Sequence, residues 1–417
     1  MRSEFAQTDI PAPGVMAVDW EQRVNFDRMR AYKDDRIKAA LDEYDLGALL
    51  LFETSNIRYL TNTHIGYWAF NKLERWALIT RNGTPYIWDF GSAAKAHRLQ
   101  CPWLDPEHSV GGNTGLQGAI APTSGLPDRA AREIKAVLDD EGVGDMRLGI
   151  DIVEMPLLQQ LQGAGIDVTD GQQAMLHARQ IKCADEIMLL SQAAAMVDAV
   201  YQDIYEALKP GMRESDVVAL ANKRLYELGS EHVEAINSIA GERCSPHPHV
   251  FSDRLIRPGD QAYFDIIHAY NGYRTCYYRT FAVGRATQSH RDAYVKAREW
   301  IDTAIELVKP GVGTDEIARA WPKAEDFGFP NEMEAFGLQF GHGVGVGLHE
   351  RPIISRLNSL DDPVELQEGM VFALETYCPA DDGHSAARIE EEVVCTADGP
   401  KLLTLFPAEE LVVTNAY

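Results

Sequence analysis

The sequence predicts an α/β (α+β) protein of two domains. The chain has 417 residues, more than one hydrophobic core usually serves, and its 45% hydrophobic content is enough for two cores. Apolar runs of strand length alternate with amphipathic segments of helical period. A Lys-Pro-Gly turn between two predicted helices occurs twice, at 209–211 and 309–311. The repeat of this turn in the same context indicates an internal duplication.

We expect the first domain, residues 1–175, to be a small α/β unit. Its strand-like apolar segments lie within 45–62, 76–80, 85–90 and 148–153. Asn82-Gly83 separates the second of these from the third, and Asn-Gly between two apolar runs predicts a hairpin. Residues 130–138 are amphipathic with helical period and predict a helix before the last strand.

The second domain, residues 176–417, is expected to begin where the composition shifts to a helical pattern. We predict one long helix over 176–208, then a turn and a second helix from Glu214 to about Leu228. The same order returns about one hundred residues later, with Thr314 starting the capped helix. The C-terminal domain is therefore predicted to be a duplicated α/β unit folded about a pseudo-twofold axis, with a cleft between its halves.

Charge and cysteine usage exclude several classes of function. The formal net charge is −24 and is spread along the chain, so the surface repels both phosphate backbones and anionic lipid. No stretch approaches the roughly 18 apolar residues of a membrane-spanning helix. The six cysteines form no Cys-x-x-Cys pair, which fits neither a disulfide framework nor a zinc ribbon. We expect a cytoplasmic protein with a small-molecule substrate and no nucleic-acid or membrane partner.

A predicted hairpin carries the first two candidate ligands. In residues 261–270 the apolar alternation turns Asp265 into an otherwise apolar layer, where a buried carboxylate needs a compensating partner. Residues 275–283 return as the paired strand. We expect Cys276 to lie alongside Asp265 across this hairpin.

Three further candidates follow in the second half. His342 stands among glycines, which let the backbone approach a ligand closely, and His349 follows seven residues later. Glu375 ends one apolar run, and Glu390 lies near the start of the next. The predicted site therefore places five ligand-type side chains on or beside adjacent strands of one sheet, namely Asp265, Cys276, His342, Glu375 and Glu390.

These motifs resemble peptidase family M24, which includes methionine aminopeptidase, aminopeptidase P, prolidase, creatinase and a dimethylsulfoniopropionate lyase. The resemblance runs from about residue 30 onward and includes the stretches at 56–62 and 209–216. It implies a creatinase-like N-terminal domain and a pita-bread catalytic domain with pseudo-twofold symmetry. It also implies a homodimer in which one subunit covers the other's cleft, and the aromatic cluster Tyr67, Trp68 and Phe70 is our candidate for that contact.

The resemblance assigns roles to individual residues. Asp265 matches the first metal-binding Asp of the peptidases, His342 the metal-binding His, and Glu375 and Glu390 the two metal-binding Glu residues. His349 resembles the second His, which contacts substrate in the peptidases.

Two more histidines are candidates for a catalytic role. His247 and His249 straddle the expected place of a further family His, and the sequence does not decide between them. Together with His342, His349 and Glu375 they complete the predicted catalytic set.

Cys276 departs from the peptidase pattern, which has a second Asp there. That Asp bridges two hard cations, whereas a thiolate is a single soft donor that favours zinc or iron over manganese. Two alternatives stay open for the site, which either holds one divalent metal ion in a mixed sulfur, nitrogen and oxygen site or is metal-free, as in creatinase. A third reading, Cys276 as a nucleophile, is weakened because surrounding carboxylates raise a thiol pKa.

The loss of the second Asp favours an enzyme, a hydrolase or lyase, that cleaves a C–N or C–S bond in a small polar non-peptide substrate. Acid–base chemistry by a His and a carboxylate pair needs no second metal. The alternative is a metal-dependent Xaa-Pro aminopeptidase or dipeptidase, which His349 favours. A second alternative is a binding protein of the same fold without catalysis.

Overall fold

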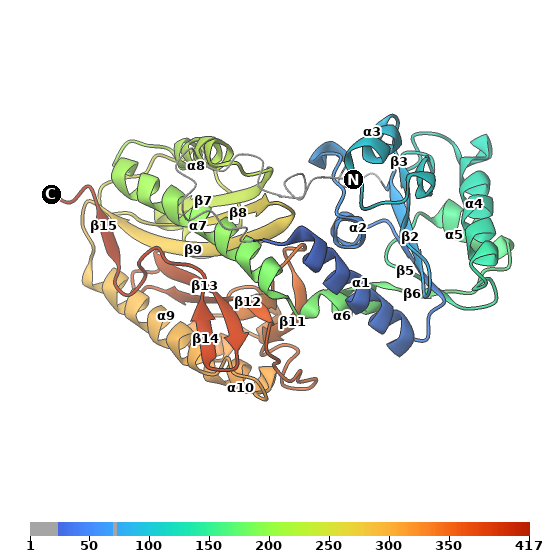
Figure 1. The fold of residues 1–417 in the computed structure, drawn as a ribbon. Coiled ribbons are helices and arrows are strands. Elements are labelled where there is room, and N and C mark those ends of the chain that lie inside the picture. Colours follow the sequence, from blue (N-terminus) through green and yellow to red (C-terminus); the bar gives the residue numbers. More distant parts are fainter. Residues whose placement is uncertain (1–23, 70–72) are drawn as a thin grey trace, which may run out of the picture. The chain divides into compact units, whose positions relative to one another are not determined.

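The computed structural model describes residues 24–69 and 73–417. Two compact units make up this part of the chain, Asn25–Arg179 and Gln180–Tyr417 (Figure 1). Phe70 of the expected aromatic cluster lies outside the described residues.

The N-terminal unit is built on a six-stranded sheet in the order β4-β3-β2-β1-β5-β6. Its strands are β1 (Ala48–Leu51), β2 (Trp76–Thr80), β3 (Tyr86–Asp89), β4 (Ser109–Gly111), β5 (Leu148–Ile150) and β6 (Val168–Asp170). Its α-helices are α1 (Phe26–Glu43), α2 (Thr54–Thr61), α3 (Ala93–Gln100), α4 (Leu126–Asp140), α5 (Met155–Gly163) and α6 (Gln172–Gln180). The predicted hairpin is confirmed, because β2 and β3 pair antiparallel.

The C-terminal unit contains two sheets, in the orders β15-β9-β8-β7 and β11-β10-β12-β13-β14. Its first half comprises α7 (Ala184–Ala207), α8 (Glu214–Leu228), β7 (His232–Ala240), β8 (Gln261–Tyr270) and β9 (Tyr273–Val283). Its second half comprises α9 (Gln288–Glu306), α10 (Thr314–Ala320), α11 (Glu332–Ala335), β10 (Phe340–Gly343), β11 (Glu350–Ser355), β12 (Val371–Pro379), β13 (Ala386–Thr396) and β14 (Gly399–Leu402). The last strand, β15 (Val412–Thr414), joins the first sheet.

The two sheets meet where β9 contacts β13. The Thr280 hydroxyl donates to the carbonyl of Arg388 at 2.6 Å and accepts from the Arg388 N–H at 2.9 Å. Helix α7 packs on β8 and β9, and helix α9 packs on β12 and β13. The inner strands of the two sheets therefore lie beside each other between the helices (Figure 1).

The backbone repeats itself around the two Lys-Pro-Gly turns. The Gly211 N–H donates to the carbonyl of Ile256 at 2.9 Å. In the second half the Gly311 N–H donates to the carbonyl of Leu366, also at 2.9 Å. Both glycines have positive φ, 93° and 88°, a conformation that other residues adopt at a cost. Each turn is thus tied to the segment that leads into a central strand, β8 in the first half and β12 in the second.

One predicted element differs. The helix expected over 176–208 is two helices, because α6 ends at Gln180 and α7 begins at Ala184. Between them the Lys182 N–H donates to the carbonyl of Gly369 at 2.9 Å, so it is not part of a helical ladder. This bond joins residues far apart in sequence, and the helical periodicity gives no sign of it.

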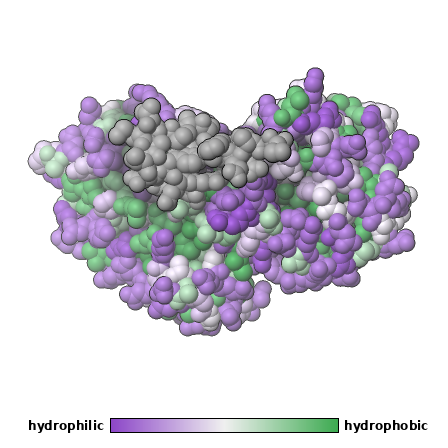
Figure 2. Space-filling model, viewed as in Figure 1, coloured by the Kyte–Doolittle hydropathy of each residue, from purple (hydrophilic) through white to green (hydrophobic). Residues whose placement is uncertain are grey.

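Much of the visible surface is hydrophilic (Figure 2). Figure 2 shows hydrophilic residues over most of the visible surface of both units, with smaller apolar patches between them. In the described ranges, no helix combines the length and the apolar character needed to cross a bilayer.

Candidate functional site

The candidate ligands come from two sheets, so the prediction of a single sheet was wrong. The first sheet carries Asp265 on β8 and Cys276 on β9. The second sheet carries His342 on β10, Glu375 on β12 and Glu390 on β13. A single sequence predicts strands from their apolar pattern, but it does not say which strands pair.

Three of the five residues form a compact donor cluster. The thiol sulfur of Cys276, a ring nitrogen of His342 and a carboxylate oxygen of Glu390 all lie within 4.8 Å of one another, and all three residues are buried. Zinc bonds of about 2.0 to 2.3 Å place ligand atoms roughly 3 to 4 Å apart around one ion. A small inward movement of these side chains would therefore let them hold one metal ion.

Glu390 is the member of this cluster that most needs a partner. It is fully buried, and neither carboxylate oxygen has a hydrogen-bond partner within the described part of the chain. Burial first, and then the carboxyls of Glu375 and Asp265, raise its pKa well above the ordinary value. A buried carboxylate without donors is stabilised by a cation or a proton, so Glu390 fits a metal ligand.

His342 is held in a tautomer suited to metal binding. Its Nδ1 lies 3.0 Å from the carbonyl of Gly343, so Nδ1 carries the proton and Nε2 keeps its lone pair. Burial first, and then the ring of His349, lower the pKa of His342 to about 3, which keeps the imidazole neutral. The exposed His349 ring lies 4.5 Å from the His342 ring, centroid to centroid.

Asp265 and Cys276 are diagonal neighbours across the first hairpin. Asp265 pairs directly with Tyr278, whereas Cys276 pairs with Ile267, which corrects the expected side-by-side arrangement. The Cys276 thiol still reaches Asp265 Oδ1 at 3.4 Å and donates to it. Burial, and then the Asp265 carboxyl, raise the Cys276 pKa well above its ordinary value. Without a cation beside it, Cys276 is therefore a poor nucleophile.

Glu375 is paired with a buried cation. Its carboxylate accepts from the guanidinium of Arg388, which also lies 4.3 Å from the ring centroid of Tyr278. Burial raises the pKa of Glu375 to about 7, although Arg388 acts in the opposite direction. Glu375 thus titrates near neutral pH.

His247 lies closer to the site than His249 does. His247 Nδ1 accepts from the His249 N–H at 3.1 Å, so its proton lies on Nε2, which is 2.8 Å from the Tyr278 hydroxyl. Tyr278 in turn hydrogen-bonds Asp265, and this bond lowers the Asp265 pKa against the larger opposing effect of burial. His249 is exposed and stacks on the outer side of His247 at 3.8 Å between ring centroids.

Four side chains that sequence reasoning left out also belong to the site, namely Asn237, Tyr278, Arg388 and Glu392. Tyr278 and Arg388 each lie two residues from a candidate ligand, so the strand period of two places them on the same face. Glu392 accepts from the Cys276 N–H at 2.9 Å, and burial raises its pKa to about 8. Asn237 donates to Asp265 Oδ2 at 2.9 Å from strand β7, and its own segment carries no signal for this contact.

Comparisons with known proteins match the C-terminal unit to one family. The model of metallopeptidase family M24 matches residues 188–397. The chain is 27% identical over 396 residues to the dimethylsulfoniopropionate lyase DddP of Roseovarius nubinhibens, covering 91% of this chain and 86% of that protein. It is also 34% identical over 232 residues to the Xaa-Pro dipeptidase of Pyrococcus furiosus, covering 54% of this chain and 63% of that protein.

Solved structures of the family share the fold. The Xaa-Pro dipeptidase of Bacillus anthracis superposes with a TM-score of 0.74 at 22% identity, covering 92% of this chain and 99% of that chain. The prolidase of Pyrococcus horikoshii OT3 gives 0.71 at 22% identity, with 91% and 99% covered. The predicted pita-bread architecture is thereby confirmed. The chain belongs to metallopeptidase family M24.

Proposed function

We propose that this enzyme cleaves a C–S or C–N bond in a small polar non-peptide molecule. The observation that carries the proposal is the sulfur of Cys276, 3.4 Å from Asp265, in the position where the peptidase pattern has its second Asp. A cysteine offers one soft sulfur donor and lacks the two hard oxygens with which a carboxylate bridges two hard cations. The two-metal hydrolysis typical of the peptidases therefore has weak support in this chain.

The donor set fits one metal ion. Cys276, His342 and Glu390 would hold it, and their sulfur, nitrogen and oxygen donors favour zinc or iron over manganese. When bound, such an ion acts as a Lewis acid toward an oxygen of the substrate. The other two carboxylates already have donors, because Asn237 binds Asp265 and Arg388 binds Glu375.

We assign proton transfer to Glu375. A carboxyl group with a pKa of about 7 can both take and return a proton near neutral pH. The ion pair with Arg388 fixes the orientation of its carboxylate. Removal of a proton beside the scissile bond leads to elimination, and activation of a water leads to hydrolysis, so the same group serves either reaction.

A row of aromatic rings that begins at Phe340, opposite Glu375 on the paired strand, favours a cationic substrate. The Phe340 ring lies 5.4 Å from the His342 ring and 6.4 Å from the His349 ring, centroid to centroid. Phe336 continues this row at 5.5 Å and is 46% exposed. Aromatic faces next to carboxylates attract sulfonium or quaternary ammonium groups. The likeness to a dimethylsulfoniopropionate lyase over 91% of the chain supports the same substrate class.

Xaa-Pro dipeptidase activity is the second candidate. His349 lies beside His342, in reach of the place where the peptidase resemblance has it contact the substrate. The P. furiosus dipeptidase is 34% identical to this chain and the lyase 27%, but the dipeptidase matches only 54% of the chain. In that case His349 would contact the peptide, and Glu375 would act as base toward the attacking water.

A substrate comparison tests the proposal. The purified protein, with its metal content measured, is assayed with dimethylsulfoniopropionate, creatine and glycyl-proline. We expect turnover of one of the first two with little or no dipeptide cleavage, and oxygen-18 water then separates hydrolysis, which incorporates the label, from elimination, which does not. Efficient glycyl-proline cleavage without turnover of either small molecule would refute the proposal.

A further inference from the structure

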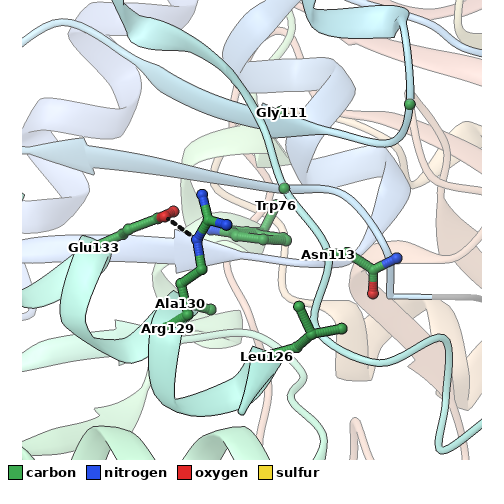
Figure 3. A pocket seen from close by; sticks show the side chains of 9 residues that line it. Trp76, Gly111, Asn113, Leu126, Arg129, Ala130 and Glu133 are labelled. Carbon is green, nitrogen blue, oxygen red and sulfur yellow. Dashed lines mark hydrogen bonds and ion pairs between the residues drawn. The ribbon is translucent and has the colours of Figure 1, made fainter. Parts of the chain in front are cut away.

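The N-terminal unit contains a cavity of about 240 Å³ between strand β2, the loop after β4 and the first turns of helix α4 (Figure 3). Trp76, Asn113, Arg129 and Glu133 are among its lining residues. A water molecule occupies about 30 Å³ in the liquid, so the cavity has room for a small organic molecule. All of its lining residues belong to the N-terminal unit, whereas the site above lies in the C-terminal unit.

Trp76 brings an unpartnered hydrogen-bond donor to this cavity. The residue is 1% exposed and its ring stacks on Phe52 and Trp88, with centroids 6.0 and 5.7 Å away. Its indole N–H has no hydrogen-bond partner among residues 24–69 and 73–417. The neighbouring indole of Trp88, in contrast, donates to Glu133 at 3.1 Å. A buried N–H without an acceptor is unfavourable, and an acceptor bound in the cavity would remove that cost.

The other polar groups of the cavity leave donors free. Arg129 Nε donates to Glu133 Oε1 at 2.8 Å, which leaves the two terminal nitrogens of the guanidinium for a ligand. Glu133 Oε2 already accepts from Trp88, as described. Asn113 Oδ1 accepts from the Gly115 N–H at 2.7 Å, which leaves its amide nitrogen. The groups that remain available are thus donors on three different segments.

We propose that this cavity binds a small carboxylate. The planar guanidinium of Arg129 matches a carboxylate in two parallel hydrogen bonds, and the Trp76 N–H and the Asn113 amide can bind the remaining lone pairs. Figure 3 shows the Arg129 guanidinium beside the Trp76 ring, with Asn113 farther along the loop that lines the cavity. Position 112 has room only for glycine, because a Cβ there would lie 2.5 Å from the Trp76 ring. The loop after β4 can therefore pass closely over the indole.

Indole nitrogen NMR on the full-length protein tests this site. The seven tryptophans are labelled with ¹⁵N at the indole, the Trp76 signal is assigned with Trp76→Phe, and acetate, acrylate and the neutral acetamide are titrated separately. We expect acetate and acrylate to shift the Trp76 signal saturably, because its N–H gains an acceptor. Arg129→Gln should weaken binding by roughly tenfold, since it removes the charge-assisted bonds.

Two matched controls make the result specific. Trp321 is also buried with an unpartnered indole N–H, but it lies in the C-terminal unit, so its signal should not move. Arg132→Gln removes an exposed arginine of the same helix that pairs with Asp128 and should leave the affinity unchanged. A Trp76 signal that does not move, an equal affinity in Arg129→Gln, or equal binding of acetamide would each overturn the proposal.

Discussion

The two halves of the C-terminal unit carry equivalent hairpins with different chemistry. In the first half Asp265 on β8 pairs directly with Tyr278 on β9. In the second half Glu375 on β12 pairs directly with Glu390 on β13. The duplicated backbone thus sets a carboxyl group at the same place in each hairpin, but it faces a phenol in one half and a second carboxyl group in the other.

The diagonal neighbours of these carboxyl groups differ in charge. In the first half the neutral thiol of Cys276 donates to Asp265. In the second half the equivalent position is Arg388, whose guanidinium donates to Glu375. A cation stabilises an ionised carboxylate far more strongly than a thiol does. The fold therefore decides where the carboxyl groups stand, and burial raises the pKa of both Asp265 and Glu375 while Arg388 lowers both.

The largest effect is expected from breaking the donor cluster at the two members that the second half contributes. His342→Ala and Glu390→Gln each remove one of three ligand-type atoms within 4.8 Å. Because metal affinity and acid–base chemistry both depend on this cluster, turnover should fall by on the order of 10³ or more. Activity and metal content are measured together, with His384→Ala at an exposed histidine as control. Turnover within a few-fold of the unmodified enzyme in both variants would remove the cluster from the mechanism.

Cys276→Asp makes the first half more like a peptidase. The new carboxylate would lie beside Asp265 in a buried cluster that already contains Glu375 and Glu390, and like charges raise carboxyl pKa values. Turnover of the native small molecule should fall by on the order of 10². Manganese content and glycyl-proline cleavage are measured in parallel. Unchanged native turnover together with a gain of dipeptide cleavage would favour the peptidase alternative.

The two halves of the C-terminal unit should also differ in how acid changes their contribution to the free energy of unfolding. His268 in the first hairpin is fully buried between the Ser230 hydroxyl and the Ala193 carbonyl, and burial lowers its pKa to about 4. The unfolded chain, with an ordinary pKa near 6.5, binds more protons between these two values. The free energy of unfolding should therefore fall by about 2 kcal/mol as the pH drops from roughly 7 to 5.

Denaturant unfolding of the unmodified protein and of His268→Gln is measured at several pH values. The variant lacks the titrating imidazole, so its free energy of unfolding should fall less between pH 7 and 5. Cys378 occupies the equivalent place in the second hairpin and its pKa is raised to about 11, so Cys378→Ser serves as control. An unchanged pH dependence in His268→Gln would show that other groups cause the acid sensitivity.

Much of the site could be predicted because polar residues interrupt apolar strands. Asp265, Glu375 and Glu390 were found this way, and the structure buries all three. Their distribution over two sheets was not found, since strand pairing is a long-range property. The break before α7 was missed for the same reason, because it depends on the hydrogen bond between Lys182 and Gly369.

Other features depend on side-chain geometry that no pattern expresses. His247 and His249 are two residues apart and equally plausible in sequence, and only the contact with Tyr278 separates them. The unpartnered indole of Trp76 is likewise invisible in a strand that reads as ordinary apolar core. Period two along β9 would, however, have placed Tyr278 beside Cys276 on the site face.

The smallest effect is expected at Tyr278, which links His247 to Asp265. Tyr278→Phe removes a hydrogen bond that lowers the Asp265 pKa, so that pKa should rise. If Asp265 acts in its ionised form, the acidic limb of the activity profile moves to higher pH, and turnover falls by roughly five- to tenfold, the value of about 1 kcal/mol for one hydrogen bond.

The matched control is Tyr277→Phe. Tyr277 is equally buried on the same strand, but its hydroxyl donates to Asp198 at 2.6 Å, on the face away from the site. A phenol that merely supports the fold would lower stability in both variants and leave both pH profiles alone. A shifted profile in Tyr278→Phe alone would establish Tyr278 as a positioning residue, because only that variant changes the hydrogen bonds of a site carboxylate. Parallel shifts in the two variants would instead assign the effect to the strand as a whole.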